Sequence, residues 1–323
     1  MEKEDTLFYE YFHNWFILFK EPEVKPVTAA KYRATEQWIK KLAPNLGIRS
    51  MTRMDMQKLV NDYGKTHEIG TVRGFFHMIK ACVEDAKYEG DVIKDPTYKI
   101  RMTSQKRKII KHSMYLEKDQ ATKLMDIFKQ HNTVVSLMFD FDVRTGLRFA
   151  ELLGLTPADV DLEKGVITVN KSWLYKNKEH ADFGETKNPY SHRTIPIDSE
   201  AKKDISKFMT HCENDEPIFV KAYSEERQFK PTNHQKYATI YDVTMNRILT
   251  QMCNEANVPR IGVHGLRHTH ASLLFNSGIS ILSISRRLGH ANTSTTEKVY
   301  VHLIDDQKQK DDDKMLKALD DIR

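Results

Sequence analysis

Residues 263–302, VHGLRHTHASLLFNSGISILSISRRLGHANTSTTEKVYVH, constrain this chain more than any other stretch. The first part starts with polar residues, runs into apolar ones and reaches Gly278, which predicts a helix that ends on a left-handed glycine. A second short helix is expected over 279–289, because Ile281, Ile284 and Leu288 recur at helical spacing before Gly289. The pattern therefore places His290 directly after the end of a helix.

Four reactive side chains lie in this stretch: His264, Arg267, His290 and Tyr300. His264 and Arg267 are three residues apart and would share the first turn of the helix. Arginine can bind two phosphate oxygens at once, and histidine can move a proton near neutral pH. Tyrosine can act as the nucleophile of a covalent intermediate, and the polar run before Tyr300 would let it move. The combination favours attack on a phosphodiester.

Other interpretations of the same residues remain open. A single buried tyrosine or histidine is usually a satisfied core residue, so each match is only a hypothesis when taken alone. His264, His268 and His270 could instead bind a metal, although no cysteine or carboxylate stands at a ligand spacing beside them. The order and spacing of all four reactive side chains favour the phosphodiester interpretation.

The segments HGLRHTHAS and LGHANTSTTEKVYVH resemble the second motif block of the tyrosine recombinases, the phage-integrase family of site-specific DNA recombinases. The family's first arginine has its counterpart at Arg148 in RTGLRFAELLGL. The lysine of its β-hairpin corresponds to Lys187 in GETKNPYSHRTIPI. The resemblance extends over nearly the whole chain and is most specific after residue 106. It implies a mainly α fold with a small antiparallel β-sheet, in which a SAM-like helical bundle that binds core DNA precedes a mixed α+β catalytic domain.

Length and composition agree with two domains and an intracellular DNA-acting protein. The chain has 323 residues, a net charge of +5 and three widely separated cysteines, which favour a reducing compartment without disulfides or a zinc site. Residues 1–110 carry 20 Lys and Arg against 15 Asp and Glu, so the whole net charge lies there. No apolar run approaches the length of a membrane span, and no signal peptide is seen. A soluble protein of the bacterial cytoplasm, without membrane contact, is expected.

Residues 1–103 are predicted to form four helices. The first carries an aromatic face, which is expected to pack inward rather than to stack on bases: Phe8, Tyr11, Phe12, Trp15, Phe16 and Phe19. Thr28 is expected to cap the second helix, and Thr52 with Asp55 forms a predicted capping box for the third. The fourth helix is expected to end at Gly90.

A basic linker is predicted over residues 104–113. The run KIRMTSQKRKIIK around it holds six basic residues and no acidic one: Lys99, Arg101, Lys106, Arg107, Lys108 and Lys111. Charge runs are commonly just solvated. A segment that crosses a phosphate backbone would look the same, and DNA contact is the favoured interpretation, since each cation placed on a phosphate releases counterions.

The catalytic domain is predicted over 114–323. Helices are expected around Leu124 and Val134–Phe141, with the latter ending at Gly146 so that Arg148 leaves the core face. Strands are expected over 166–169, 194–197 and 216–220 (EPIFV), with Lys187 near the tip of a hairpin between the first two. Glu151 is interpreted as a support that orients a neighbouring group, as its counterpart does in the family. Four aspartates around Arg148 are interpreted as solvated or capping residues: Asp140, Asp142, Asp159 and Asp161.

The resemblance also implies roles. Tyr300 would form a 3′-phosphotyrosine, Arg148 and Arg267 would clamp the phosphate, and His264, His290 and Lys187 would bond the phosphate or move protons, without ATP, metal or any other cofactor. The alternatives are a type IB topoisomerase, a non-catalytic DNA-binding regulator and a metal-dependent nuclease or transposase.

The resemblance further implies the partners of the chain. These are double-stranded DNA attachment sites, three further copies that form a homotetramer by exchange of a tail helix over 306–323, and an excisionase or directionality factor. The sequence looks most like integrases of bacteriophages and conjugative transposons, which integrate or excise a mobile element.

Overall fold

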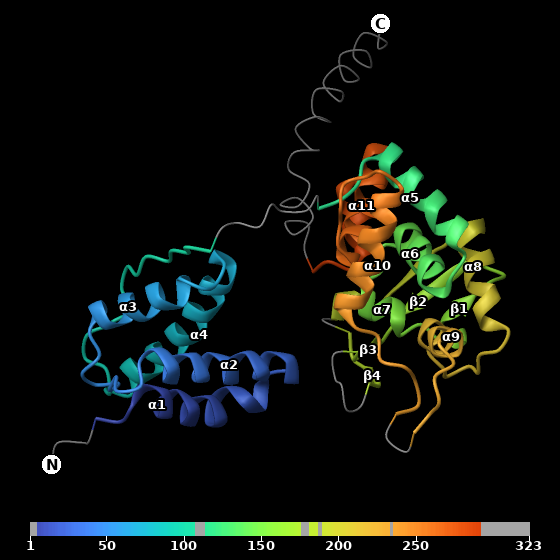
Figure 1. Ribbon diagram of the computed structural model, residues 1–323. Coiled ribbons are helices and arrows are strands. Elements are labelled where there is room, and N and C mark those ends of the chain that lie inside the picture. Colours follow the sequence, from blue (N-terminus) through green and yellow to red (C-terminus); the bar gives the residue numbers. More distant parts are fainter. Residues whose placement is uncertain (1–4, 107–113, 176–180, 187–188, 233–234, 292–323) are drawn as a thin grey trace, which may run out of the picture. The chain divides into compact units, whose positions relative to one another are not determined.

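The computed structural model describes residues 5–106, 114–175, 181–186, 189–232 and 235–291. The chain divides into two compact units, residues 1–110 and 111–323 (Figure 1). This division falls inside the segment 104–113 that the sequence predicts as a linker. No helix of the described residues is both long and apolar enough to cross a lipid bilayer.

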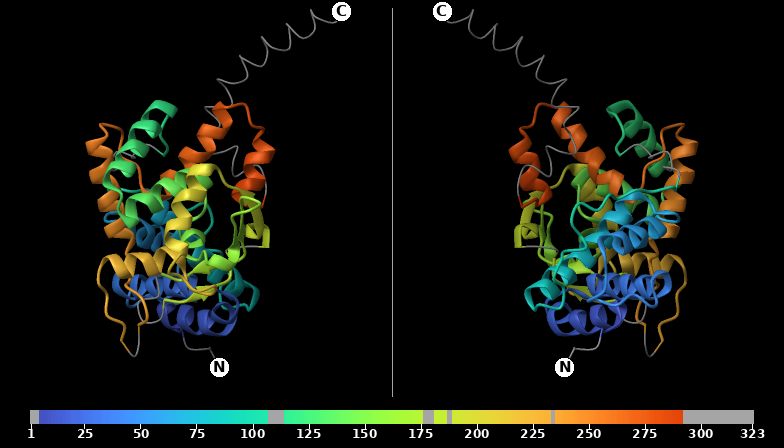
Figure 2. Two further views of the ribbon diagram at one scale, coloured as in Figure 1. Left: turned by 90° about the vertical axis from the view of Figure 1, so that its right-hand side faces the viewer. Right: turned by 90° about the vertical axis from the view of Figure 1, so that its left-hand side faces the viewer.

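Within residues 5–106, the first unit is a bundle of four helices: α1 (Phe8–Trp15) with a π-helical turn (Phe16–Lys20), α2 (Pro26–Leu42), α3 (Arg53–Gly64) and α4 (Ile69–Tyr88). Helices α1 and α2 lie side by side (Figures 1 and 2, dark blue). The predicted aromatic face is confirmed for Phe8, Phe12, Trp15 and Phe16, which are buried. It is wrong for Phe19, which is 49% exposed. The π-helical turn changes the number of residues per turn, so Phe19 no longer follows the buried stripe.

The ends of these helices test three predictions. The capping box of Thr52 and Asp55 is confirmed at the start of α3. The end of α4 before Gly90 is confirmed, since Gly90 has a φ of +77°. Thr28 does not cap α2, because the helix begins earlier, with Lys25 as its N-cap residue and Pro26 in the first turn. Proline is pre-organised for that position, and this preference outweighs the hydroxyl signal of the threonine.

Hydrogen bonds hold the last described residues of the first unit against α3 and the turn that follows it. The side-chain amide of Gln57 donates to the carbonyl oxygen of Arg101 (2.7 Å) and accepts from its backbone N–H (2.9 Å). The hydroxyl of Ser104 donates to the His67 carbonyl, and the backbone N–H of Gln105 donates to the Gly64 carbonyl. Residues 104 and 105 therefore pack with this unit, beyond the predicted end of the domain at 103.

The second unit combines helices with short strands: α5 (Lys118–His131), α6 (Val134–Thr145), α7 (Phe149–Leu153), β1 (Val160–Asp161), β2 (Val166–Val169), β3 (Ser172–Trp173), β4 (Phe183–Gly184), β5 (Arg193–Pro196), α8 (Ser199–Met209), α9 (Ile218–Glu226), α10 (Asp242–Glu255), α11 (Val263–Asn276) and α12 (Ile281–Leu288). The strands form two antiparallel sheets, in the orders β1-β2-β5 and β3-β4. Helix α11 packs on α6, and both contribute to one apolar core. The predicted fold class is confirmed.

Two of the three predicted strands are confirmed. The expected strand over 166–169 is β2, and the expected strand over 194–197 is β5, which begins one residue earlier and pairs with β2 so that Ile167 lies opposite Ile195. The expected strand over 216–220 is wrong, because the chain there begins α9. The apolar run Ile218–Val220 is buried and continues as a helix through Glu226. Short apolar runs do not distinguish a strand from a buried helix.

Candidate functional site

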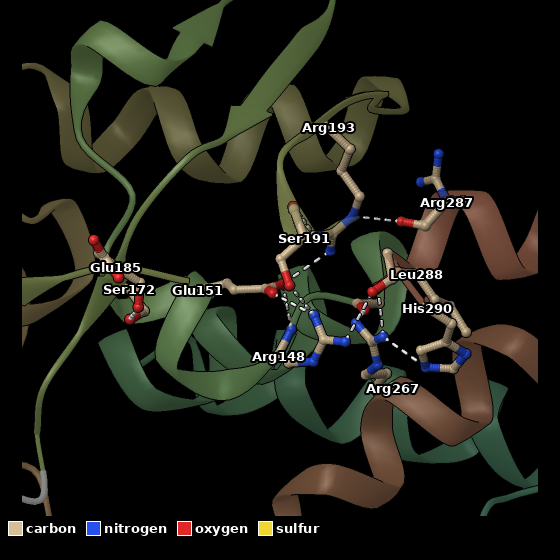
Figure 3. A network of polar contacts seen from close by, with 12 residues as sticks. Arg148, Glu151, Ser172, Glu185, Ser191, Arg193, Arg267, Arg287, Leu288 and His290 are labelled. Atoms are coloured by element: carbon tan, nitrogen blue, oxygen red, sulfur yellow. Dashed lines mark hydrogen bonds and ion pairs between the residues drawn. The ribbon is translucent and has the colours of Figure 1, made fainter. Parts of the chain in front are cut away.

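Arg267 lies at the centre of the candidate site, on α11, and is 2% exposed. Its guanidinium donates through Nη1 to the carbonyl oxygen of Gly146 (2.7 Å) and through Nη2 to that of Leu288 (2.6 Å). Nη2 also lies 3.0 Å from Nε2 of His290 (Figure 3). The two carbonyls come from the residues that end α6 and α12, where the helix dipole is negative and favours a cation.

Arg148 joins this group from the start of α7. Helix α6 stops at Gly146, which has a φ of +66°, and Arg148 follows as the N-cap residue of α7. Its Nη1 donates to Glu151 Oε1 (2.6 Å) and to the Ser191 hydroxyl (3.0 Å), and its Nη2 donates to the Gly289 carbonyl (2.9 Å). Because Leu288 and Gly289 are adjacent, the two predicted arginines bind neighbouring carbonyls and lie together, as Figure 3 shows.

Glu151 connects Arg148 to an arginine that the sequence interpretation missed. Its second oxygen, Oε2, accepts from Nη2 of Arg193 at 2.9 Å. Burial alone would raise the pKa of Glu151, but Arg193 and Arg148 outweigh burial, and the pKa is lowered. Glu151 therefore stays ionised and holds both guanidinium groups, which agrees with its interpretation as a support. The only signal for Arg193 in the sequence is its place directly before the strand predicted over 194–197.

His290 follows Gly289, whose φ of +68° ends α12 and turns the chain toward Arg267. Burial, with Arg267 and Arg148 as further causes, lowers the pKa of His290 to about 4. The imidazole is therefore neutral at neutral pH. A guanidinium can only donate, so Nε2 accepts from Arg267 and we assign the ring proton to Nδ1. The prediction that His290 lies directly after a helix end, beside Arg267, is confirmed.

His264 lies on the exposed side of the first turn of α11. Its ring meets that of His268 edge-on, with ring centroids 4.7 Å apart. Burial, together with His264 and Arg267, lowers the pKa of His268 to about 4. His264 therefore lies on the same helix as Arg267 and beside His268, and its place in the site stays a prediction.

Hydrogen bonds of His270 and Arg287 connect the helices that carry the site. His270 Nδ1 lies 2.8 Å from the Val143 carbonyl and therefore donates to it, so Nε2 accepts from Arg287 Nε at 2.9 Å. Burial, with Arg287 as the next cause, lowers the pKa of His270 to about 3. Both ring nitrogens are engaged, which contradicts the alternative that His270 is a metal ligand. The described residues contain no group of three side chains arranged to hold a metal ion.

Two of the four aspartates near Arg148 differ from prediction. Asp140 and Asp142, for which the sequence predicts a solvated or capping role, are both buried within α6. Each has a carboxylate oxygen (Oδ1) that has no hydrogen-bond partner among the described residues. Burial raises the pKa of Asp142 well above its usual range, although Arg267 acts in the opposite direction. The capping interpretation is confirmed for Asp159, which accepts from the Thr156 backbone N–H. Asp161 is partly exposed and pairs with Lys164.

Several predicted site residues lie outside the described residues: Arg107, Lys108, Lys111, Lys187, Tyr300 and the tail 306–323. Lys187 was expected near the tip of a hairpin. In the chain it follows β4 by three residues, while residues 174–182 connect β3 to β4. Lys99, Arg101 and Lys106 are described and exposed, in the first unit. The described geometry therefore brings together Arg148, Arg267 and His290, with His264 on the same helix as Arg267.

The match to a family model decides the family. The model of the phage integrase family covers residues 114–307, which is more than half of the chain and includes every predicted catalytic position. The chain belongs to the phage integrase family. The resemblance to the tyrosine recombinases that its motifs indicate is thereby confirmed, and the enzyme is a tyrosine recombinase of the integrase type.

Individual relatives agree with this assignment. The chain is 28% identical to an integrase of Staphylococcus phage L54a over 302 residues, which cover 87% of this chain and 83% of the phage protein. It resembles the fold of the Tn1549 transposon integrase, solved in complex with a circular intermediate DNA, with a TM-score of 0.71, 18% identity and coverage of 91% and 94%. It also resembles a lambda integrase tetramer solved on a Holliday junction, with a TM-score of 0.65, 15% identity and coverage of 89% and 78%. None of these proteins is named a topoisomerase.

Proposed function

We propose that this integrase cuts and rejoins DNA strands at the attachment sites of a mobile element through the cluster of Arg148, Arg267 and His290. The observation that carries the proposal is the convergence of two arginines on the adjacent carbonyls of Leu288 and Gly289. Guanidinium groups fixed in this way can stabilise the negative charge that gathers on a phosphate in the transition state. The lowered pKa of Arg267, about 9 owing to burial and to the neighbouring Arg148, still leaves it charged at neutral pH.

The proposed nucleophile is Tyr300. Its phenolic oxygen forms a bond to the scissile phosphorus, and the bond from phosphorus to the 5′-oxygen breaks. The products are a 3′-phosphotyrosine and a DNA strand that ends in a 5′-hydroxyl. The 5′-hydroxyl of a partner strand then attacks the phosphotyrosine and restores a phosphodiester. One phosphodiester is exchanged for another, so the cycle needs no ATP.

The other predicted residues supply protons and hydrogen bonds. His264 takes the phenolic proton or bonds the phosphate, and Lys187 gives a proton to the departing 5′-oxygen. The neutral imidazole of His290 carries its proton on Nδ1 and bonds the phosphate through it, since Nε2 faces Arg267. The arginines supply the positive charge, so cleavage is expected to proceed in the presence of EDTA.

The first unit is proposed to hold the DNA duplex. Residues 1–110 carry the whole net positive charge of the chain, and the proposed phosphate contacts are Lys99, Arg101, Lys106, Arg107, Lys108 and Lys111. Because related integrases have been solved on DNA and as a tetramer, we extend both properties to this chain. Exchange of the tail 306–323 would close the tetramer. An excisionase or directionality factor and a place in the bacterial cytoplasm complete the proposal.

Covalent trapping tests the proposed function. The full chain is incubated with nicked duplexes from both flanks of the mobile element that carries its gene, and the adduct is mapped by mass spectrometry. We expect a DNA adduct on Tyr300 that the Tyr300→Phe variant lacks while it still binds DNA. Tyr241→Phe, which changes an exposed tyrosine of the same unit, is the control and should still form the adduct. An adduct that survives Tyr300→Phe would overturn the assignment of the nucleophile.

Strand exchange separates the recombinase from the topoisomerase alternative. Two duplexes with different labels are mixed with the protein, and the products are resolved by size. Joining of the two labels supports recombination. Relaxation of supercoiled DNA without any joined product would favour a topoisomerase, for which the comparisons give no support.

A further inference from the structure

Arg193, at the start of β5, is a buried arginine to which the proposed function gives no role. Its side chain is 7% exposed, and each of its three nitrogens donates a hydrogen bond. Nε donates to the Arg287 carbonyl (2.6 Å), Nη1 to the Ser191 carbonyl (2.8 Å) and Nη2 to Glu151 Oε2 (2.9 Å). All three nitrogens of Arg193 thus donate to oxygens of the protein, and the proposed function gives Arg193 no contact with the phosphate.

We propose that Arg193 is a positioning residue, which fixes the two phosphate-binding arginines and His290 relative to one another. The inference rests on the proposed function, because it takes the phosphodiester to be the group that Arg148 and Arg267 bind. Arg193 reaches this cluster from three sides (Figure 3).

The first side is Glu151. The carboxylate bridges two guanidinium groups and is itself 2% exposed. With Arg148 alone, one negative charge would cancel one positive charge. Arg193 adds a second positive charge, so Glu151 can hold Arg148 while the trio keeps a net charge of +1 for an anionic substrate. Without Arg193, Glu151 would pair with Arg148 only, and the attraction of Arg148 for a phosphate would be reduced.

The second side is Ser191, which is fully buried. Arg193 binds the carbonyl oxygen of Ser191, while the hydroxyl of the same residue accepts from Arg148 Nη1 at 3.0 Å. Arg193 thus fixes the backbone that carries one acceptor of Arg148. Two separate paths, one through a carboxylate and one through a hydroxyl, therefore connect Arg193 to the same guanidinium.

The third side is the end of α12. The Arg287 carbonyl that accepts from Arg193 precedes the Leu288 carbonyl that accepts from Arg267 and the Gly289 carbonyl that accepts from Arg148. His290 is the next residue. Gly289 also lies close to Arg193, since a Cβ at that position would be 3.0 Å from Nη1. Arg193 therefore anchors the turn on which both arginines and His290 depend.

If Arg193 had only a structural role, its loss would have a different effect on cleavage. Loss of such a residue lowers the amount of folded enzyme and slows cleavage of every substrate by the same factor. Loss of a residue that aims Arg148 at an anionic oxygen slows cleavage only where that oxygen carries charge. A methylphosphonate at the scissile position replaces the charged oxygen by a methyl group, and it therefore separates the two roles.

The experiment compares single-turnover cleavage of two nicked duplexes, one with the native phosphodiester and one with a methylphosphonate at the same position. For Arg193→Met in the full chain we expect the phosphodiester rate to fall by about 100-fold, the scale of a displaced catalytic group. The methylphosphonate rate should change by less than about 3-fold. Arg144→Met is the matched control, because Arg144 is also ion-paired in this unit and largely covered, with a side chain that is 14% exposed, but it pairs with Asp140 and Asp198. Its two rates should change together.

Each outcome decides the matter. Equal losses on both substrates for Arg193→Met would overturn the positioning role. If Arg193→Met does not fold, Arg193→Lys, which keeps the charge but not the forked donors, is scored by the same ratio. If the methylphosphonate reacts too slowly to measure, Arg193→Met is combined with Arg148→Lys. If the effects of the two substitutions on the activation free energy of phosphodiester cleavage add in the double variant, the inference is overturned. If the effect of the double variant is well below their sum, the inference is supported. A wild-type chain that forms no adduct would instead refute the proposed function.

Discussion

Gly146 links the fold of the second unit to its site, and its replacement by alanine tests that link. The residue ends α6 with a φ of +66°, and its carbonyl accepts from Arg267. A Cβ at this position would lie 2.4 Å from Cδ2 of His270 and 3.1 Å from Cδ2 of Leu288. Gly146→Ala therefore imposes both a backbone strain and a steric overlap next to the arginine cluster.

The size of the effect follows from these two terms. A left-handed alanine costs about 1–2 kcal/mol, offset by about 0.4–1 kcal/mol because alanine lowers the entropy of the unfolded chain. Ordinary carbon contacts lie at about 3.5–4.0 Å, so the imidazole of His270 must move. Such overpacking costs about 1–3 kcal/mol, and His270 risks its bonds to Val143 and Arg287, worth about 1 kcal/mol each. We expect Gly146→Ala to lower the free energy of unfolding by about 3–5 kcal/mol.

Gly278→Ala is the matched control. Gly278 follows α11 in the same unit with a φ of +82°, and a Cβ there would meet nothing within 4 Å. It should therefore cost only the backbone term, about 1 kcal/mol. Cys253 has a buried thiol in this unit, so its labelling at increasing urea concentration reports the unfolding of this unit alone. Equal losses for the two variants would refute the steric part of the reasoning.

Two further predictions concern pH and the tail. The folded pKa of His270 is about 3, against 6.5 for the unfolded chain, so its contribution to stability is complete above pH 6.5 and is lost as the pH falls toward 3. When the pH is lowered from 7.5 to 5, the free energy of unfolding of the His270→Gln variant should fall by about 2 kcal/mol less than that of the wild type. Urea titrations at the two pH values measure both decreases, and equal decreases would contradict this prediction. Deletion of residues 306–323 should leave binding to one duplex intact but weaken assembly of two duplexes in native gels; unchanged assembly would exclude tail exchange.

Sequence reasoning located the features that are encoded locally. Glycines at helix ends fix where Arg148 and His290 leave their helices, and both glycines have the positive φ that their position requires. The capping box of Thr52 and Asp55 is local for the same reason. Each of these features depends on a few neighbouring residues, so a short pattern is enough to predict it.

Some features that depend on distant partners were not predicted. Arg193 acquires its role from Glu151 and Arg287, which are 42 and 94 residues away in the chain. The burial of Asp142 inside α6 depends on the packing of α11 against that helix. The apolar run at the start of α9 predicts a strand, because its period alone does not separate a short buried helix from a strand. A single sequence holds no direct record of such contacts.

The way in which the two arginines are held explains how the site keeps its charge. Arg148 is bound partly by a carboxylate, and Glu151 would neutralise it if Arg193 did not share that carboxylate. Arg267 is bound by the carbonyls of Gly146 and Leu288, at the ends of two helices. Carbonyl dipoles stabilise a buried cation without cancelling its charge, so Arg267 still attracts an anion. If each arginine were instead held by its own carboxylate, the site would have no net charge with which to attract a phosphate.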